Sequence, residues 1–194
     1  MTYQLLIEAI ERQVHLDEIE IDNIRAAFQP QYLKRREVLI HQGDVCRYEY
    51  FVNSGCLRSF YTVKDTQHTL MFATEGWWTG SLKSFLKSIP SAITIEAMES
   101  THLLRISRPQ LEALYDHVPK LDRFFRLLLQ NRLMATQDRV LDHLTLPATE
   151  RYAQFLQQYP TLGQRVAQKY IASYLGISPA FLSRLRRPPT DLLT

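Results

Sequence analysis

The sequence has 194 residues, of which 45% are hydrophobic and 22% charged, and this composition excludes a disordered chain. No apolar run approaches the roughly 18 residues that would cross a bilayer, and the N-terminus lacks the basic-then-apolar pattern of a secretory signal. Two cysteines are too few for a disulfide scaffold. We therefore expect a soluble, cytoplasmic protein of one or two domains.

The charge is unevenly distributed along the chain. The net charge is only +3, yet residues 150–194 hold six basic and two acidic side chains. A basic terminal segment on a near-neutral body favours a polyanionic partner, either nucleic acid or acidic lipid. A solvated basic surface is the ordinary alternative.

The first half of the sequence changes from a helical to a strand-like pattern of apolar residues. Residues 3–28 are predicted to form one or two short helices, which Pro30 ends. From about residue 32 to 106, short apolar runs alternate with turn residues, and their near-even spacing indicates a β-sandwich or barrel. The predicted strands lie at Val38–Ile40, Tyr50–Val52, Leu57–Tyr61, Thr69–Phe72, Ile93–Ala97 and Leu103–Ile106.

The chain then becomes helical again. Ser107 is predicted to cap a short helix, and Pro119 opens a much longer one that Pro147 closes. The apolar face of the long helix is wider than one packing contact requires. It fits either two contacts, with the barrel and with another subunit, or a single buried core helix. One more helix over 149–158 and a loop over 160–163 are expected to follow.

Residues 168–187 have the spacing of a helix-turn-helix. Two closely crossing helices need a small residue, here Ala172, and the turn between them needs the positive φ that Gly176 adopts freely. Ser178 is an N-cap followed by a proline, which is a strong signal for the start of the second helix. The apolar residues expected to pack between the helices are Ile171, Leu175, Ile177, Leu182 and Leu185.

The second helix would present a polar and basic face to the major groove of double-stranded DNA. Arg184 can bond a guanine edge at two positions, and Ser183 can reach a phosphate or a base. The DNA-binding candidates are Ala180, Ser183 and Arg184 for bases, Gln168, Lys169, Arg186 and Arg187 for phosphates, and Ser178 and Pro179 at the helix start. The alternative is an ordinary helical hairpin with a solvated basic face.

On these residues the chain resembles the Crp/Fnr family of bacterial transcription regulators, in its shorter Bacteroidetes-like form. The resemblance covers nearly the whole chain, and the helix-turn-helix ending at Leu182–Arg184 is its most specific part. In the barrel it rests on Ile40–Asp44, Phe51–Gly55 with Leu57, Glu75–Ser81, Ser91–Ala92 and Ile95–Ala97.

The resemblance implies an α+β fold. A cyclic-nucleotide-binding-like sensor β-roll, which is a double-stranded β-helix or jelly roll with flanking helices, would span residues 1–118. A dimerisation helix over 119–146 and a helix-turn-helix DNA-binding domain over 147–194 would follow. The family also implies a homodimer on a palindromic operator, with RNA polymerase and an unknown small-molecule effector as further partners. It implies no cofactor and no catalysis.

The sequence departs from the family at the nucleotide pocket. Members that bind cyclic nucleotides hold the ribose and the cyclic phosphate with a glutamate and an arginine. Ser81 stands at the glutamate position and Pro90 at the arginine position. A buried phosphate would lose its charge-assisted partner, so cyclic AMP is not expected to be the effector. The residues expected to line a pocket for another small molecule are Gly80, Ser81, Leu82, Ser91 and Ala92.

The C-terminus is a second departure. Only seven residues follow Arg187, and Pro188 and Pro189 stop the helix. A two-stranded wing would need about a dozen residues, so the final wing is expected to be truncated or absent. Fewer phosphate contacts per subunit would weaken DNA binding relative to winged relatives at equal salt.

Two other function classes fit the same fold. One is a small-molecule-binding β-roll whose DNA-binding end has degenerated, and the other is a cupin-like metalloenzyme. The compact His-x-His motif of such enzymes is absent, and two cysteines cannot supply the four ligands usual for an iron–sulfur cluster. We therefore predict no metal site and no catalytic site. The residues expected to be structural or solvated are His41, His68, His102, Cys46, Cys56, and the pairs Glu18/Glu20 and Glu96/Glu99.

Overall fold

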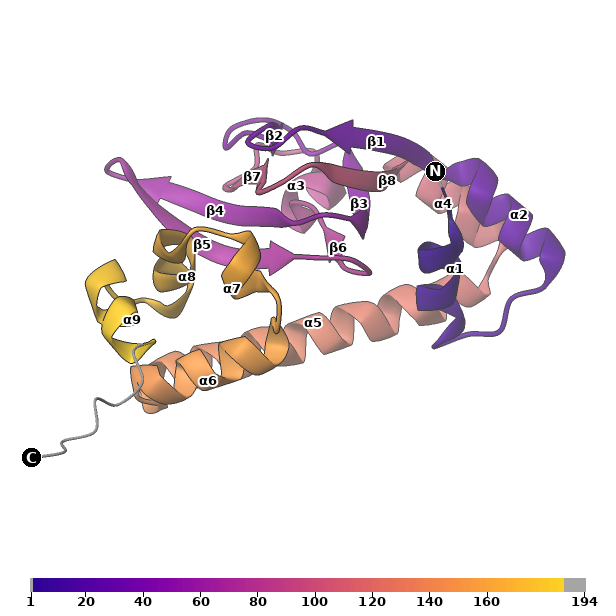
Figure 1. The fold of residues 1–194 in the computed structure, drawn as a ribbon. Helices are drawn as coiled ribbons and strands as arrows, with labels where there is room; N and C mark the ends of the chain where they lie inside the picture. The colour runs from indigo at the N-terminus through magenta and orange to yellow at the C-terminus, as the bar shows by residue number, and fades with distance from the viewer. Residues whose placement is uncertain (1, 187–194) are drawn as a thin grey trace, which may run out of the picture.

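The computed structural model describes residues 2–186 and has the α+β fold expected (Figure 1). Two helices come first, α1 (Gln4–Glu11) and α2 (Glu18–Ala27). The strands are β1 (Gln29–Leu33), β2 (Val38–Ile40), β3 (Tyr48–Ser54), β4 (Leu57–Val63), β5 (Thr66–Ala73), β6 (Trp78–Thr79), β7 (Thr94–Ala97) and β8 (Thr101–Ser107), with α3 (Leu82–Lys87) between β6 and β7. The chain continues through α4 (Arg108–His117), α5 (Lys120–Thr145), α6 (Ala148–Gln158), α7 (Leu162–Arg165), α8 (Gln168–Leu175) and α9 (Pro179–Leu185).

The strands form two antiparallel sheets, with the orders β1-β8-β3-β6 and β2-β7-β4-β5. This β-roll confirms the prediction of a sandwich or barrel, and each of the six predicted strands is present. The prediction missed β1 and β6. Pro30 suggests a break in the chain, but it lies in the edge strand β1 opposite Leu104, and an edge position tolerates the missing N–H.

Two turns of the β-roll, one in a hairpin and one at a glycine, have backbone φ angles that are positive. Lys64 and Asp65 have φ values of 46° and 61°, the left-handed conformation of a tight hairpin between β4 and β5. Gly55 has a φ of +100°, and a Cβ there would lie 2.7 Å from Thr101 Cα. Because the neighbouring backbone blocks that position, only glycine fits before β4.

The packing of the helices divides the interior into two cores. The first core lies within the β-roll and is covered by α1, α2, α4 and the start of α5. The second joins the sheet to the C-terminal helices, because Phe72 and Met98 pack with Phe155, Tyr159 and Tyr174. In Figure 1, α7 and α8 accordingly lie beside the sheet that contains β4 and β5. The C-terminal helices are therefore anchored to the β-roll rather than separate from it.

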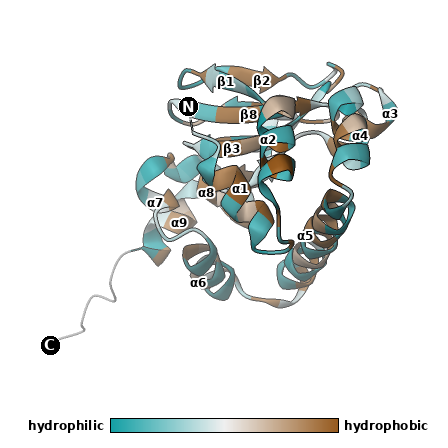
Figure 2. Cartoon of the chain, turned by 90° about the vertical axis from the view of Figure 1, so that its right-hand side faces the viewer, coloured by the Kyte–Doolittle hydropathy of each residue, from teal (hydrophilic) through white to brown (hydrophobic). Residues whose placement is uncertain are grey.

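Helix α5 is only partly buried. Its first turns pack into the β-roll through Leu121 and Phe124, whereas Leu133 is 60% exposed and Leu144 is 78% exposed. In Figure 2, hydrophobic and hydrophilic segments alternate along the length of this helix. The interpretation of α5 as a single buried core helix is therefore wrong for the described chain.

Capping residues and prolines in the sequence predicted most helix ends correctly. Ser107 Oγ accepts a hydrogen bond from Gln110 N, which confirms the predicted cap of α4. The predicted loop over 160–163 is wrong, because α7 begins at Leu162, whose side chain is buried in the second core. Within residues 2–186, no helix is long and apolar enough to cross a membrane.

Candidate nucleic-acid interface and ligand pocket

Helices α8 and α9 meet in the turn that the sequence predicts. Gly176 adopts φ 69° and ψ 32° and ends α8, and Ile177 N donates to Ala172 O at 3.0 Å. Ser178 Oγ accepts from Phe181 N at 3.2 Å, so this serine caps α9 with Pro179 as the first helical residue. These local bonds set the angle at which α9 leaves α8.

A small apolar core holds the two helices together. Ile171, Ala172, Leu175 and Leu182 are buried, as predicted, and Ala172 is fully enclosed. Ile177 and Leu185 are half-buried. The close crossing therefore depends on the alanine, because a larger side chain would push the helices apart.

The candidate DNA-contacting residues lie on an open surface. Arg184 stands on the exposed side of α9, with its guanidinium 5.3 Å from the Phe181 ring. Among the ion pairs of residues 2–186, none involves Lys169, Arg184 or Arg186. The exposed candidates are Gln168, Lys169, Ser178, Pro179, Ala180, Ser183, Arg184 and Arg186, and Arg187 and the two prolines after it lie outside the described residues.

Helix α8 contacts the β-roll along the edge strand β5. Ser173 Oγ accepts from Thr69 N at 2.9 Å and donates to Gln67 O at 3.1 Å. Tyr159, which follows α6, donates its hydroxyl to Phe72 O at 3.2 Å. These bonds satisfy backbone groups of an edge strand and attach the C-terminal helices to the β-roll.

Arg165 adds an ionic contact between the two parts. Its guanidinium lies 2.7 Å from Glu75 and 2.5 Å from Glu99, and the pairing lowers the pKa of the Glu75 carboxyl against the effect of its partial burial. Arg165 is therefore occupied within the chain and is not one of the free charges of the basic C-terminal segment. The expectation that Glu99 lies on a solvated face is wrong for the same reason.

Arg58 on β4 is the most buried cation of the described chain. Its guanidinium lies 2.9 Å from Glu96 and donates to Thr69 Oγ1 and Gln67 Oε1. It is also sandwiched between the Phe60 ring at 4.2 Å and the ring of Tyr170 on α8 at 4.0 Å.

Glu96 is thus a structural partner, and its expected place on a solvated face is wrong. Arg58 was missed because nothing in the sequence marks an arginine in a strand as buried. Burial lowers the pKa of Arg58, but a guanidinium stays charged, which is why it needs each of these partners.

The predicted ligand residues do not line one cavity of the described chain together. Ser81 and Ser91 are buried, and Ser91 Oγ donates to Ile93 O, while Ala92 is exposed. Only Gly80 of the five borders the cavity that lies between the β-roll, α5 and the C-terminal helices.

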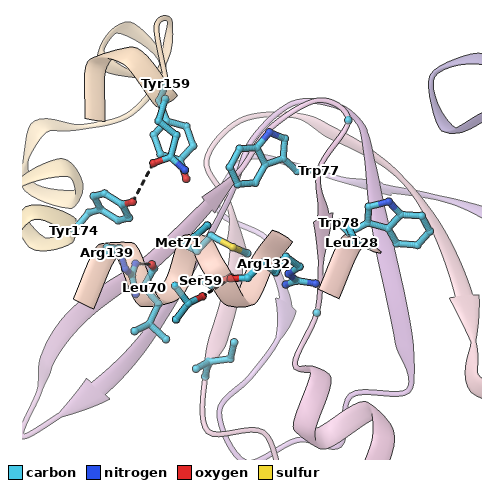
Figure 3. Close-up of a pocket in the computed structure, with 16 residues that line it drawn as sticks. Ser59, Leu70, Met71, Trp77, Trp78, Leu128, Arg132, Arg139, Tyr159 and Tyr174 are labelled. Carbon is cyan, nitrogen blue, oxygen red and sulfur yellow. Dashed lines mark hydrogen bonds between the residues drawn. The ribbon is translucent and has the colours of Figure 1, made fainter. Parts of the chain in front are cut away.

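That cavity has a volume of about 440 Å³ and is shown in Figure 3. Its walls come from three parts of the fold: the β-roll with Trp77, Trp78 and Met71, helix α5 with Arg132 and Arg139, and the C-terminal helices with Tyr159 and Tyr174.

The sequence held one unused signal for this cavity. Arg132 and Arg139 are seven residues apart, so they lie on the same face of a helix. Within residues 2–186, no group of three His, Cys, Asp or Glu side chains is arranged to hold a metal ion. Both cysteines are buried free thiols in the structure.

Comparisons with known proteins agree with this architecture. Residues 30–117 match the family model described as cyclic nucleotide-binding domain. The chain is 27% identical to the anaerobic regulatory protein of Aggregatibacter actinomycetemcomitans, over 94% of this chain and 73% of the relative. It is 24% identical to the regulatory protein HlyX of Actinobacillus pleuropneumoniae, over 86% of this chain and 72% of the relative. The chain thus contains a cyclic nucleotide-binding domain and is similar over most of its length to regulatory proteins of the Crp/Fnr type.

Solved structures agree with the Crp/Fnr-type fold. The catabolite activator protein of Thermus thermophilus aligns with a TM-score of 0.60 and 26% identity, over 91% of this chain and 84% of that protein. FixK2 from Bradyrhizobium japonicum aligns with a TM-score of 0.71 and 22% identity, over 81% of this chain and 82% of FixK2, and this likeness concerns the fold alone. The curated relatives are named as regulatory proteins rather than as enzymes.

Proposed function

We propose that this chain is a homodimeric, sequence-specific DNA-binding regulator of the Crp/Fnr type. The observation that carries the proposal is the exposed face of α9, where Ser183 and Arg184 stand free beside a capped, glycine-containing turn. The bonds of α8 to β5 support it, because they fix α8 against the β-roll while Ser183 and Arg184 on α9 stay exposed.

The proposal assigns a task to each part of the chain. Residues 1–118 would sense a ligand, residues 119–146 would dimerise, and residues 147–194 would bind DNA. The exposed apolar residues Leu129, Leu133 and Val140 on α5 support dimerisation, because their spacing of four and seven residues fits the d, a and a positions of a coiled-coil seam, and exposed Leu144 flanks that seam. Double-stranded DNA and a second copy of the chain are the proposed partners, with RNA polymerase as a further one.

An unbiased selection from random double-stranded DNA tests the function, without added ligand. We expect a two-fold-symmetric motif whose half-sites lie about one helical turn apart. A chain whose DNA-binding end has degenerated would yield no motif, and that result would contradict the proposal.

Arg184→Ala should weaken binding to the selected site by about 1–3 kcal/mol and relax the preference at one base pair. The reason is that Arg184 is the exposed arginine nearest the middle of α9, where it can reach a guanine edge. Competition binding against site variants measures both effects. Arg186→Ala is the matched control, because a phosphate contact at the helix end should weaken all sequences equally. If Arg184→Ala weakened binding to all DNA sequences equally, Arg184 would contact the DNA backbone instead of a base.

Cyclic AMP is expected not to be the effector. Pro90 and Ser81 offer neither the cation nor the carboxylate that the family uses for the phosphate and the ribose. Calorimetric titration of the full chain with cyclic AMP should therefore show no tight, saturable binding. A tight one-to-one isotherm would overturn this expectation.

A further inference from the structure

The polypeptide connection between α5 and the C-terminal helices is short. Only Leu146 and Pro147 separate Thr145, the last residue of α5, from Ala148, the first residue of α6. Both connecting residues have extended backbone, with ψ values of 142° and 155°. A few residues at the end of a helix are enough to act as a hinge. The connection by itself therefore does not fix the orientation of α8 and α9 relative to α5.

Polar contacts at both ends of β5 fix this orientation from the side of the β-roll. Near the β4–β5 hairpin, Ser173 on α8 bonds the backbone of the edge strand at Thr69 N and Gln67 O. Beyond the other end of the strand, Arg165 forms ion pairs with the loops that follow β5 and β7. About 20 Å of strand lies between Gln67 and the end of β5. Contacts so far apart prevent the helix pair from tilting as well as from sliding.

A cation–π stack and an apolar core strengthen the same attachment. The ring of Tyr170 on α8 lies 4.0 Å from the guanidinium of Arg58. Arg58 cannot follow a moving helix, because it is 1% exposed and lies 2.9 Å from Glu96. Phe72 of β5 is fully buried in the second core, and Phe72 O accepts the hydroxyl of Tyr159. A swing of the C-terminal helices would therefore expose apolar surface as well as break polar contacts.

A rigid attachment of this kind has a consequence for a two-fold dimer on DNA. The β-roll, rather than the connection after α5, then fixes the distance and the angle between the two α9 helices. Each base pair inserted between two half-sites moves one half-site by about 3.4 Å and turns it by about 35° around the DNA axis. Two rigidly held helices cannot follow that change unless the DNA itself is deformed.

We propose that the contacts of the β-roll with the C-terminal helices set the spacing of the DNA half-sites that the dimer binds. Ser173, Tyr170 and Arg165 are then positioning residues for DNA recognition, because they contact the β-roll and act on DNA only through α9. The inference rests on the proposed function of a DNA-binding homodimer. It adds a source of specificity that is independent of the bases that Arg184 contacts.

Competition binding of the full chain to three DNA duplexes tests the inference. The duplexes are the selected site, the same site with one base pair inserted between its half-sites, and a single half-site. We expect the insertion to lower the affinity of the unmodified chain about a hundredfold or more, because both half-sites can no longer be bound at once. The single half-site reports whether α9 itself still binds DNA.

The double variant Ser173→Ala, Arg165→Gln removes the polar contacts at both ends of β5 and leaves the apolar core in place. The insertion should lower its affinity less than about tenfold, while its affinity for the single half-site stays unchanged. Tyr170→Leu, which removes only the stack on Arg58, should relax the spacing in the same direction. Gln164→Ala is the matched control, because Gln164 is an exposed residue of α7 beside Arg165 and should leave the spacing requirement unchanged.

The possible failures are distinguishable. An unmodified chain that binds the inserted site as tightly as the selected one would overturn the inference, and so would variants that keep the full spacing requirement. Variants that bind all three duplexes more tightly than the unmodified chain would also overturn it, because the attachment would then hold α9 away from DNA. An unmodified chain that binds none of the duplexes would instead refute the proposed function itself.

Discussion

Arg58→Ala is expected to lower the free energy of unfolding by about 3–5 kcal/mol, as measured by urea denaturation. Arg58 is 1% exposed, and its loss leaves Glu96, with a side chain 16% exposed, without its ion-pair partner. It also removes the contact with Tyr170, so the attachment of α8 to the β-roll weakens at the same time. A loss of this size is a large fraction of the stability of a typical domain.

Two further variants distinguish the effect of burial on stability from the effect of charge. Arg25→Ala removes an ion pair with Asp22 from a site where the arginine side chain is 51% exposed, and it should cost less than about 1 kcal/mol. Arg58→Met combined with Glu96→Leu removes both buried charges and should recover most of the lost stability. Equal losses in Arg25→Ala and Arg58→Ala would contradict the account of Arg58 as a buried cation.

Leu133→Glu is expected to weaken self-association about a hundredfold or more. In a two-fold dimer through α5 the substitution removes two apolar side chains and places two like charges in one interface. Leu133 is 60% exposed in the described chain and lies in the middle of the apolar stripe. Sedimentation equilibrium of the purified protein measures the dissociation constant, and DNA with two half-sites should be bound far more weakly by the variant.

Ile19→Glu is the matched control for the dimer. Ile19 is 74% exposed on α2, away from the stripe, so a charge there should leave the association unchanged. A monomeric unmodified chain, or a Leu133→Glu chain that stays dimeric, would contradict dimerisation through α5.

The helix-turn-helix illustrates what local sequence signals can predict. Its turn, cap and small residue act over four or five neighbouring positions, so Gly176, Ser178 and Ala172 could be identified without any tertiary information. The strands could be predicted for the same reason, because alternating apolar runs and turn residues are local patterns. Short α7 was missed because a distant contact, the burial of Leu162 in the second core, stabilises it.

The cavity beside α5 illustrates the opposite case. The resemblance predicts ligand contacts at Gly80, Ser81 and Ser91, and of these three residues only Gly80 borders the cavity. The cavity depends on where α5 crosses the β-roll and on where α6 and α8 pack, so Arg132 and Tyr159 line the same cavity although 27 residues separate them. The spacing of residues along the chain does not predict that such distant residues line one cavity.

Local chemistry in the sequence was enough to predict the strands of a sandwich or barrel, the long helix and the helix-turn-helix, because caps, turns and apolar periodicity act between near neighbours. The tertiary structure alone decided which charges are free and which are occupied. Arg165 and Arg184 look equivalent in the sequence, yet one pairs with Glu75 and Glu99 and the other stands exposed. The reason is physical: the state of a charge depends on the burial and the partners that the fold brings to it from distant segments.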